Sequence, residues 1–132
     1  MDGSAATILY IEDSLDNRIL VRRILLAEGY DVLEAGGAAE GLELAQHNLP
    51  DLVLVDINMP HLDGLSLASM MKADPALEST PVVALTANVM RGDRERTLAA
   101  GCDGYIQKPI DVDAFPQQIA HYLQQRPVGG LS

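Results

Sequence analysis

The sequence predicts a doubly wound α/β fold with one five-stranded parallel sheet and helices on both of its faces. Five short apolar segments alternate with longer amphipathic ones along the 132 residues, and the third apolar segment is continuous. Such alternation is typical of βα units in a parallel sheet. A continuous apolar core, as in residues 52–55, indicates a strand that is buried on both faces. The chain has no residues to spare for a second domain.

The strands are expected where short apolar runs end in polar residues. The second run is the weakest of the five because Asp31 and Glu34 interrupt it. The expected strands are residues 7–11, 30–35, 51–56, 81–86 and 104–107.

Helices are expected over residues 15–28, 38–47, 65–73, 93–100 and 111–125. Gly29 and Gly101 follow the first and the fourth helix, and glycine suits the left-handed position at a helix end. Pro50 ends the second helix because proline cannot continue it. Asp111 is expected to cap the last helix with its side-chain oxygen.

The composition excludes several classes of partner. The net charge is −10, from 9 basic and 19 acidic residues, and such a surface repels nucleic acid and anionic lipid. Cys102 is the only cysteine, which excludes an internal disulfide. Residues 1–7 do not resemble a signal peptide, and no apolar run reaches the roughly 18–20 residues of a membrane helix. We therefore expect a cytoplasmic protein that binds neither nucleic acid nor membrane.

Acidic side chains stand at the ends of two expected strands. Glu12 and Asp13 follow the first strand, and Asp56 ends the third. In open parallel sheets, ligands bind beyond the carboxyl ends of the strands, where the strand order reverses. With the strand order 2-1-3-4-5, the first and third strands are neighbours at this point, so the three carboxylates converge.

Converging carboxylates predict a bound cation. Two like charges about 4 Å apart repel by about 4 kcal/mol at an effective dielectric constant of about 20. Mg²⁺ removes this cost, since it binds carboxylate oxygens together with substrate phosphate, and phosphoryl transfer depends on such charge neutralisation. Thr86, which ends the fourth strand, and Lys108, which follows the fifth, add a hydroxyl donor and a positive charge for phosphate oxygens.

The loop after the third strand completes a set of motifs with a familiar order. The set is Glu12-Asp13, Asp56, Met59-Pro60, Asp63-Gly64, Thr86-Ala87, Tyr105 and Lys108-Pro109. In this order and spacing, the set resembles the receiver domains of two-component response regulators, over about residues 6–126. Residues 101–110 look especially like stand-alone receivers and those of hybrid histidine kinases. The resemblance implies a flavodoxin-like (βα)₅ fold.

The resemblance also implies which residues hold the phosphoryl group and the metal. Asp56 would be the phosphoacceptor. Asp13 would bind Mg²⁺ directly, Glu12 would help through water, and Asn58 would offer its main-chain carbonyl. A Glu-Asp pair is an ordinary variant of the first acidic motif in this family.

Three further positions follow from the same resemblance. Thr86, Ala87 and Lys108 would contact the phosphoryl oxygens. Tyr105 would turn inward when Thr86 is drawn to the phosphate, so Thr86 and Tyr105 would form the switch. The Lys108-Pro109 bond is expected to be cis, an isomer that costs only about 0.5–1 kcal/mol before proline.

By resemblance, the protein is a signalling switch and not an enzyme, although it takes part in its own phosphorylation and dephosphorylation. A sensor histidine kinase or a histidine phosphotransfer protein would be the donor. Residues 7–126 would form the receiver domain, between a flexible segment, 1–6, and a tail, 127–132. Met1 and the short tail favour a complete regulator over part of a longer protein, and the sequence leaves the pathway open.

The surface of the fourth helix, fifth strand and fifth helix is expected to carry the signal out. Val89 and Met90 are apolar residues in a loop before the fourth helix, although packing under that loop would explain them equally well. Arg91, Arg94 and Arg96 form a basic island beside them. We expect a downstream effector, or a second copy of the chain, to bind this surface more tightly after phosphorylation.

Two other classes of α/β protein remain as alternatives. A phosphatase or phosphotransferase of the haloacid-dehalogenase type needs a second Asp two residues after its nucleophile, where this chain has Asn58, and it carries a cap domain. A flavodoxin-like electron carrier would suit the negative charge. However, no phosphate-cradling loop follows the first strand, and Glu12 and Asp13 would repel a flavin phosphate. A yellow colour of the purified protein would reveal a flavin.

Overall fold

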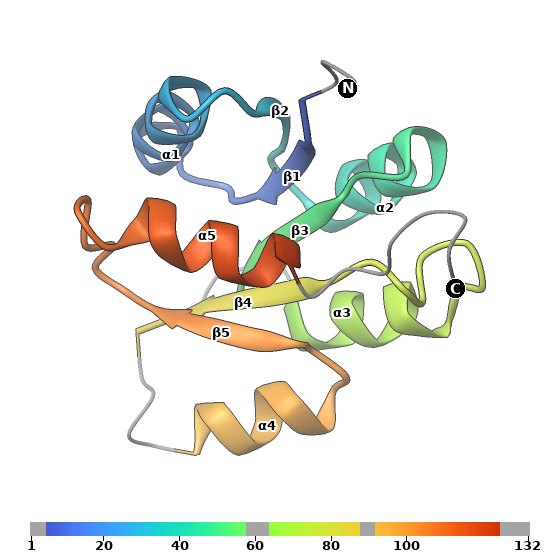
Figure 1. Ribbon diagram of the computed structural model, residues 1–132. Helices are drawn as coiled ribbons and strands as arrows, with labels where there is room; N and C mark the ends of the chain where they lie inside the picture. Colours follow the sequence, from blue (N-terminus) through green and yellow to red (C-terminus); the bar gives the residue numbers. More distant parts are fainter. Residues whose placement is uncertain (1–4, 58–63, 88–91, 125–132) are drawn as a thin grey trace.

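A computed structural model gives the fold of the chain and describes residues 5–57, 64–87 and 92–124 (Figure 1). Five parallel strands form one sheet in the order β2-β1-β3-β4-β5, which confirms the predicted topology. The elements are β1 (Thr7–Ile11), α1 (Leu15–Ala27), β2 (Asp31–Ala35), α2 (Ala38–Asn48), β3 (Leu52–Asp56), α3 (Gly64–Ala73), β4 (Val82–Thr86), α4 (Asp93–Ala99), β5 (Gly104–Gln107) and α5 (Phe115–Gln124).

The middle of the sheet is shielded from solvent. Every residue of β3 and β4 is buried, whereas the edge strands β2 and β5 contain exposed residues. This agrees with the continuous apolar runs of β3 and β4 and with the polar residues that interrupt β2. The position of each strand therefore follows from how apolar it is.

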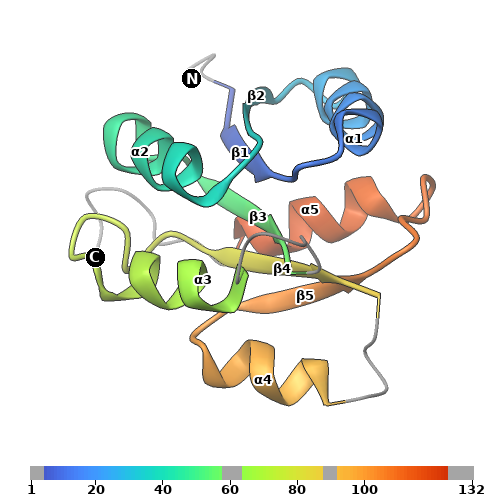
Figure 2. The same ribbon diagram turned by 180° about the vertical axis from the view of Figure 1, so that it is seen from behind.

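Alternation along the strands divides the core into two layers. Leu9 and Ile11 of β1 belong to a cluster with α2 and α3, while Ile8 and Tyr10 belong to a cluster with α1 and α5. Figures 1 and 2 show α1 and α5 on one face of the sheet, α2 and α3 on the other, and α4 beside the edge strand β5. A side chain's parity in its strand thus decides which helices it meets.

Glycine ends two of the helices as predicted. Gly29 has φ 90° and its N–H donates to the Leu26 carbonyl, and Gly101 has φ 96° and donates to Leu98. At the start of α1, the Ser14 side chain accepts a hydrogen bond from the Asn17 N–H. These contacts satisfy polar main-chain groups that a helix end leaves without partners inside the helix.

The last helix is the one element whose predicted start is wrong. All other ends lie within one residue of their expected positions, but α5 begins at Phe115 and not at Asp111. Asp111 caps a turn, where its side chain accepts the N–H groups of Asp113 and Ala114. Pro116 explains the delay, because it has no N–H with which to extend the helical ladder back to Val112.

Strand register places the chemistry-bearing residues at one edge. Ile11 of β1 pairs with Val55 of β3, so Glu12 is level with Asp56. Thr86 of β4 pairs with Gln107 of β5, which brings Lys108 to the same edge. Among the described residues, no helix is both long and apolar enough to cross a membrane.

We predict that Leu49→Gly stabilises the fold. Leu49 follows α2 with φ 47° and ψ 64°, a left-handed conformation, and is 55% exposed, so its side chain contributes little packing. The left-handed conformation costs a residue with a Cβ about 1–2 kcal/mol, and glycine would remove this cost. Glycine also loses more conformational entropy on folding, so the net gain in stability should be about 0.5–1 kcal/mol. The free energy of unfolding in urea measures it.

Met70→Gly is the matched control. Met70 is 53% exposed but lies inside α3, where glycine should cost about 1 kcal/mol. If Leu49→Gly lowers stability as much as Met70→Gly does, the left-handed conformation is not a source of strain.

Candidate functional site

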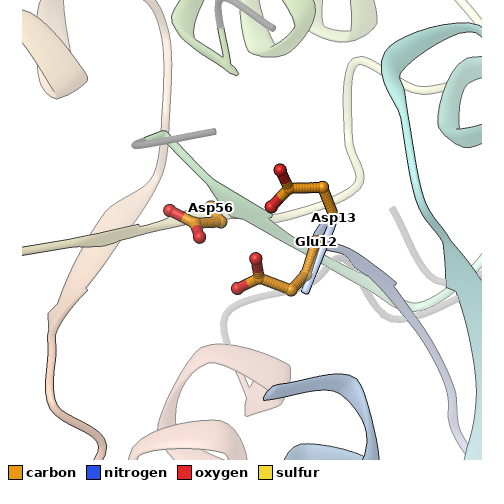
Figure 3. A group of neighbouring side chains, drawn as sticks. All are labelled: Glu12, Asp13 and Asp56. Atoms are coloured by element: carbon orange, nitrogen blue, oxygen red, sulfur yellow. The ribbon is translucent and has the colours of Figure 1, made fainter. Parts of the chain in front are cut away.

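Three carboxylates meet at the carboxyl edge of the sheet. Oxygens of Glu12, Asp13 and Asp56 lie within 4.8 Å of one another. Figure 3 shows Glu12 and Asp13 extending from the end of β1 toward Asp56, which ends β3. Glu12 and Asp56 are buried, and Asp13 is exposed. The convergence predicted from the strand order is therefore present, and solvent reaches the cluster from the side of Asp13.

Glu12 lies in a dense network of hydrogen bonds. Its Oε1 accepts from the Tyr10 hydroxyl at 3.1 Å and from the Asn17 amide at 3.4 Å, and its Oε2 accepts from the Ser14 N–H at 3.1 Å. Burial, followed by the hydrogen bond with Asp56, raises the pKa of Glu12 to about 7. A divalent cation among the carboxylates would oppose this shift, since it favours the ionised form.

Lys108 supplies the positive charge that the sequence predicted. Its Nζ lies 2.9 Å from Oδ2 of Asp56, in a pair whose Asp56 side chain is only 4% exposed. The Lys108 N–H donates to the Thr86 carbonyl at 2.8 Å, which ties the loop after β5 to the end of β4. The Lys108-Pro109 peptide bond is cis, as predicted.

Thr86 and Tyr105 lie on the same face of neighbouring strands. Tyr105 of β5 pairs with Ala84 of β4, and Thr86 lies two residues further along β4, so all three side chains share one face. Thr86 is completely buried, Tyr105 is half-buried, and Ala87 follows at an exposed position. The Tyr105 carbonyl accepts a hydrogen bond from the Tyr122 hydroxyl of α5 at 3.2 Å.

A cavity of about 500 Å³ opens beside the carboxylates, between α1 and the loop after β5. Leu20 and Val21 of α1 form part of its wall, and Glu12 and Lys108 border it on the side of the cluster. The same cavity reaches Tyr10 at its base. The site is therefore accessible from the face of the sheet that α1 and α5 cover.

Sequence reasoning missed two residues that support the site. Tyr10 was assigned only to a strand, although the period of two residues places it on the same face as Glu12. The sequence shows Gly64 only as part of the Asp63-Gly64 motif. A Cβ at Gly64 would lie 2.9 Å from the Ile57 Cα and 3.1 Å from the Asp56 carbonyl oxygen, so glycine lets α3 start against the end of β3.

Several predicted residues lie outside the described parts of the chain. Asn58, which the resemblance makes a metal ligand through its carbonyl, is one of them. Val89, Met90 and Arg91 of the expected output loop are others, and the side chain of Arg94 is also not described. Their roles stay predictions.

The described donor set fits a hard divalent cation. Mg²⁺ binds oxygen ligands, usually one or two carboxylates together with a phosphate. The three carboxylates of the cluster can provide these carboxylate ligands. An ionised carboxylate with a nearby ammonium can also accept a phosphoryl group, since the ammonium offsets the charge that gathers on the phosphoryl oxygens. Asp56 and Lys108 have this arrangement.

Comparisons with known proteins agree with the geometry of the site. The polar-differentiation response regulator DivK from Brucella anthropi is 39% identical over 117 residues, which cover 89% of this chain and 95% of that protein. The chemotaxis response regulator CheY4 of Vibrio cholerae has a similar structure, with a TM-score of 0.85 and 25% identity over 90% of this chain and 99% of that one.

A third relative was solved with a metal. The receiver domain of the sensor histidine kinase PA1611 from Pseudomonas aeruginosa, with a magnesium ion coordinated in its active-site cleft, has a TM-score of 0.84 and 29% identity. The two chains match over 92% of this one and 99% of that one. The family model of the response regulator receiver domain matches residues 8–120. The chain therefore belongs to the receiver domain family of two-component response regulators.

Proposed function

We propose that Asp56 accepts a phosphoryl group from the phosphohistidine of a sensor histidine kinase or a histidine phosphotransfer protein. The observation that carries this proposal is the position of Asp56, which is buried at the end of a central strand, 2.9 Å from the Lys108 ammonium. Two further carboxylates lie beside it. Receiver domains act with histidine kinases and downstream effectors, and this proposal adds the residue that links the two.

In the proposed step, an Asp56 carboxylate oxygen attacks the phosphorus of the donor. The new P–O bond forms as the P–N bond to the imidazole breaks, and the imidazole leaves with the electron pair and takes a proton from solvent. Lys108 can follow the charge from the carboxylate to the phosphoryl oxygens, because its ammonium already lies beside Asp56. Thr86 ends β4 at the same edge, and its hydroxyl and the main chain at Ala87 would donate hydrogen bonds to these oxygens.

Mg²⁺ is the proposed cofactor. Asp13 and Asp56 would hold it directly, Glu12 would support it through water, and Asn58 would complete the set with its main-chain carbonyl. When bound, the ion neutralises the charge of the carboxylates and of the incoming phosphoryl group. The exposed position of Asp13 supports its proposed role as a direct ligand, since an ion can reach its carboxylate from solvent.

Phosphorylation would act on the rest of the molecule through Thr86 and Tyr105. A phosphoryl group adds about −1.5 to −2 charges at neutral pH, and Lys108 and the Thr86 hydroxyl would be drawn toward it. Because Thr86 and Tyr105 share one face of the sheet, the space that Thr86 leaves is available to the Tyr105 ring. The proposal thereby connects the site to β5 and to the helix beside it.

We further propose that α4, β5 and α5 form the surface that binds a downstream effector or a second copy of the chain. On α4, Leu98 is 48% exposed and Arg96 is also exposed, which supports a contact surface with an apolar and a basic component.

The proposed receiver domain spans residues 7–126, in agreement with the family match over 8–120. The single thiol, Cys102, is buried and free, which suits the reducing conditions of the cytoplasm.

We predict that Asp56→Asn abolishes phosphorylation, because an amide cannot act as the nucleophile. The wild-type protein, incubated with phosphoramidate and Mg²⁺, should gain the mass of one phosphoryl group in an intact-mass spectrum. Asp51→Asn is the control and should be modified like the wild type, since Asp51 precedes β3 at the end opposite to Asp56, where its Oδ2 accepts the Thr7 N–H. Full modification of Asp56→Asn would show that another residue accepts the group.

The metal assignment predicts that Asp13→Asn raises the dissociation constant for Mg²⁺ by at least about tenfold, since a ligand charge is lost. Glu12→Ala should have a smaller effect. Asp16→Asn is the control, because Asp16 is an exposed acid in the first turn of α1. Isothermal titration calorimetry measures the affinities. An unchanged phosphorylation rate after complete chelation of Mg²⁺ would refute the role of the metal.

The output proposal predicts where phosphorylation changes the structure. Adding beryllium fluoride with Mg²⁺, which mimics a phosphoryl group, should shift the NMR signals of Tyr105 and of residues on α4 and β5, in addition to those of the site. A complete shift from a mostly inactive to a mostly active population would require phosphorylation to favour the active state by roughly 5.5 kcal/mol, and a partial shift would require less. Shifts confined to α1 and α2, with Tyr105 unaffected, would show that the signal leaves by another route.

A further inference from the structure

We propose that Tyr10 is a positioning residue for the metal site, which acts through its hydrogen bond to Glu12. The inference rests on the proposed function, since it assumes that Glu12 supports Mg²⁺. The resemblance assigns no role to Tyr10, which reads in the sequence as one apolar residue of a buried strand. In the structure its hydroxyl donates to Oε1 of Glu12 at 3.1 Å, and both residues are only 1% exposed.

Strand geometry explains why this contact forms. Tyr10 and Glu12 are two residues apart at the end of β1, so their side chains leave the same face of the sheet. The ring of Tyr10 packs in the core cluster under α1 and α5, with Ile8 and Leu54. The ring therefore has one fixed position, and its hydroxyl extends from the core to the carboxylate. Tyr10 and Glu12 also border the same cavity.

Tyr10 differs from the other two donors to Glu12. Asn17 is exposed on α1 and its contact is longer, at 3.4 Å. The Ser14 N–H binds the other oxygen, Oε2, and belongs to the loop that leads into α1. Of the three donors, only Tyr10 belongs to a buried and packed side chain, and this packing holds its hydroxyl against Oε1. Burial and the charge of Glu12 raise the pKa of Tyr10 well above its ordinary range, so the phenol remains a donor.

A fixed Glu12 matters because its neighbours compete for it. Carboxylate oxygens of Glu12 and Asp56 lie within 4.8 Å of each other. If Oε1 loses the Tyr10 hydroxyl, the Glu12 side chain is free to turn toward Asp56, the group that must bind the metal and the phosphoryl group. The Tyr10 hydroxyl therefore favours the orientation of Glu12 in which Asp56 remains available.

The test is Tyr10→Phe, which keeps the ring and removes only the hydroxyl. Its dissociation constant for Mg²⁺, measured by calorimetry, should rise by about fivefold, below the tenfold or more typical of partners that orient a direct metal ligand, because Glu12 would support the ion through water. Phosphorylation by phosphoramidate should be slower at low Mg²⁺ and should approach the wild-type rate at saturating Mg²⁺. Tyr30→Phe is the control and should bind Mg²⁺ like the wild type, since Tyr30 is a half-buried tyrosine that packs against the same core cluster.

A double-mutant cycle separates a role through Glu12 from a general loss of packing. In the Glu12→Ala background, Tyr10→Phe should change the affinity by less than about twofold, because the partner of the hydroxyl is already gone. An equal loss of affinity in both backgrounds would overturn the proposal. A second measurement needs no variant: the ring signals of Tyr10, but not those of Tyr30, should shift in an NMR titration of the wild type with Mg²⁺. No shift at Tyr10 would also overturn it.

These outcomes distinguish the role of Tyr10 from the proposed function. Suppose that the wild type binds Mg²⁺ and is phosphorylated on Asp56, and that Tyr10→Phe binds Mg²⁺ equally well. The role of Tyr10 would then be wrong and the proposed function would stand. Failure of the wild-type protein to bind Mg²⁺ would overturn both.

Discussion

Two adjacent parallel strands are followed or ended by acidic residues at the same level of the sheet. The rest of the site depends on the repulsion between these carboxylates. Ile11 pairs with Val55, which forces Glu12 and Asp56 together whatever their charges. Two features reduce the repulsion between the carboxylates. The Lys108 ammonium lies 2.9 Å from Asp56, and the pKa of Glu12 is raised. The cluster is therefore poised to gain a cation, since any added positive charge relieves it.

The backbone around this cluster is fixed by short-range contacts and not by the carboxylates themselves. The Ile57 N–H donates to the Leu85 carbonyl, and the Lys108 N–H donates to the Thr86 carbonyl. Gly64 adds a steric condition, because any side chain there would press on the Asp56 main chain. The strand ends thus hold their positions while the side chains change charge. Such preorganised geometry is what phosphoryl transfer requires of a protein.

How much the sequence could predict depended on whether a residue acts through its neighbours in the chain or through tertiary contacts. The apolar runs predict the strands. The polar residues at their ends predict that Asp13, Asp56 and Lys108 lie close together, because the carboxyl ends of parallel strands lie at one edge of the sheet. The predicted start of α5 is wrong because Asp111 caps a turn, and Pro116 lacks the N–H that would extend the helix back toward it. The roles of Tyr10 and Gly64 depend on distances between elements, which periodicity alone does not provide.

The two faces of the sheet carry different parts of the proposed site. Tyr10, Leu54 and the cavity beside Glu12 lie on the side of α1 and α5, whereas Ala84 and Tyr105 belong to the cluster with α2 and α3. Thr86 has the parity of Ala84, so its side chain starts on the second face. In the proposed switch, a change at Asp56 would therefore pass around the ends of β3 and β4 to reach Tyr105. Tyr10 and Glu12 on the first face would act on metal binding, whereas Thr86 and Tyr105 on the second would carry the change to β5. Because the Tyr105 carbonyl accepts the Tyr122 hydroxyl, α5 on the first face would respond together with β5.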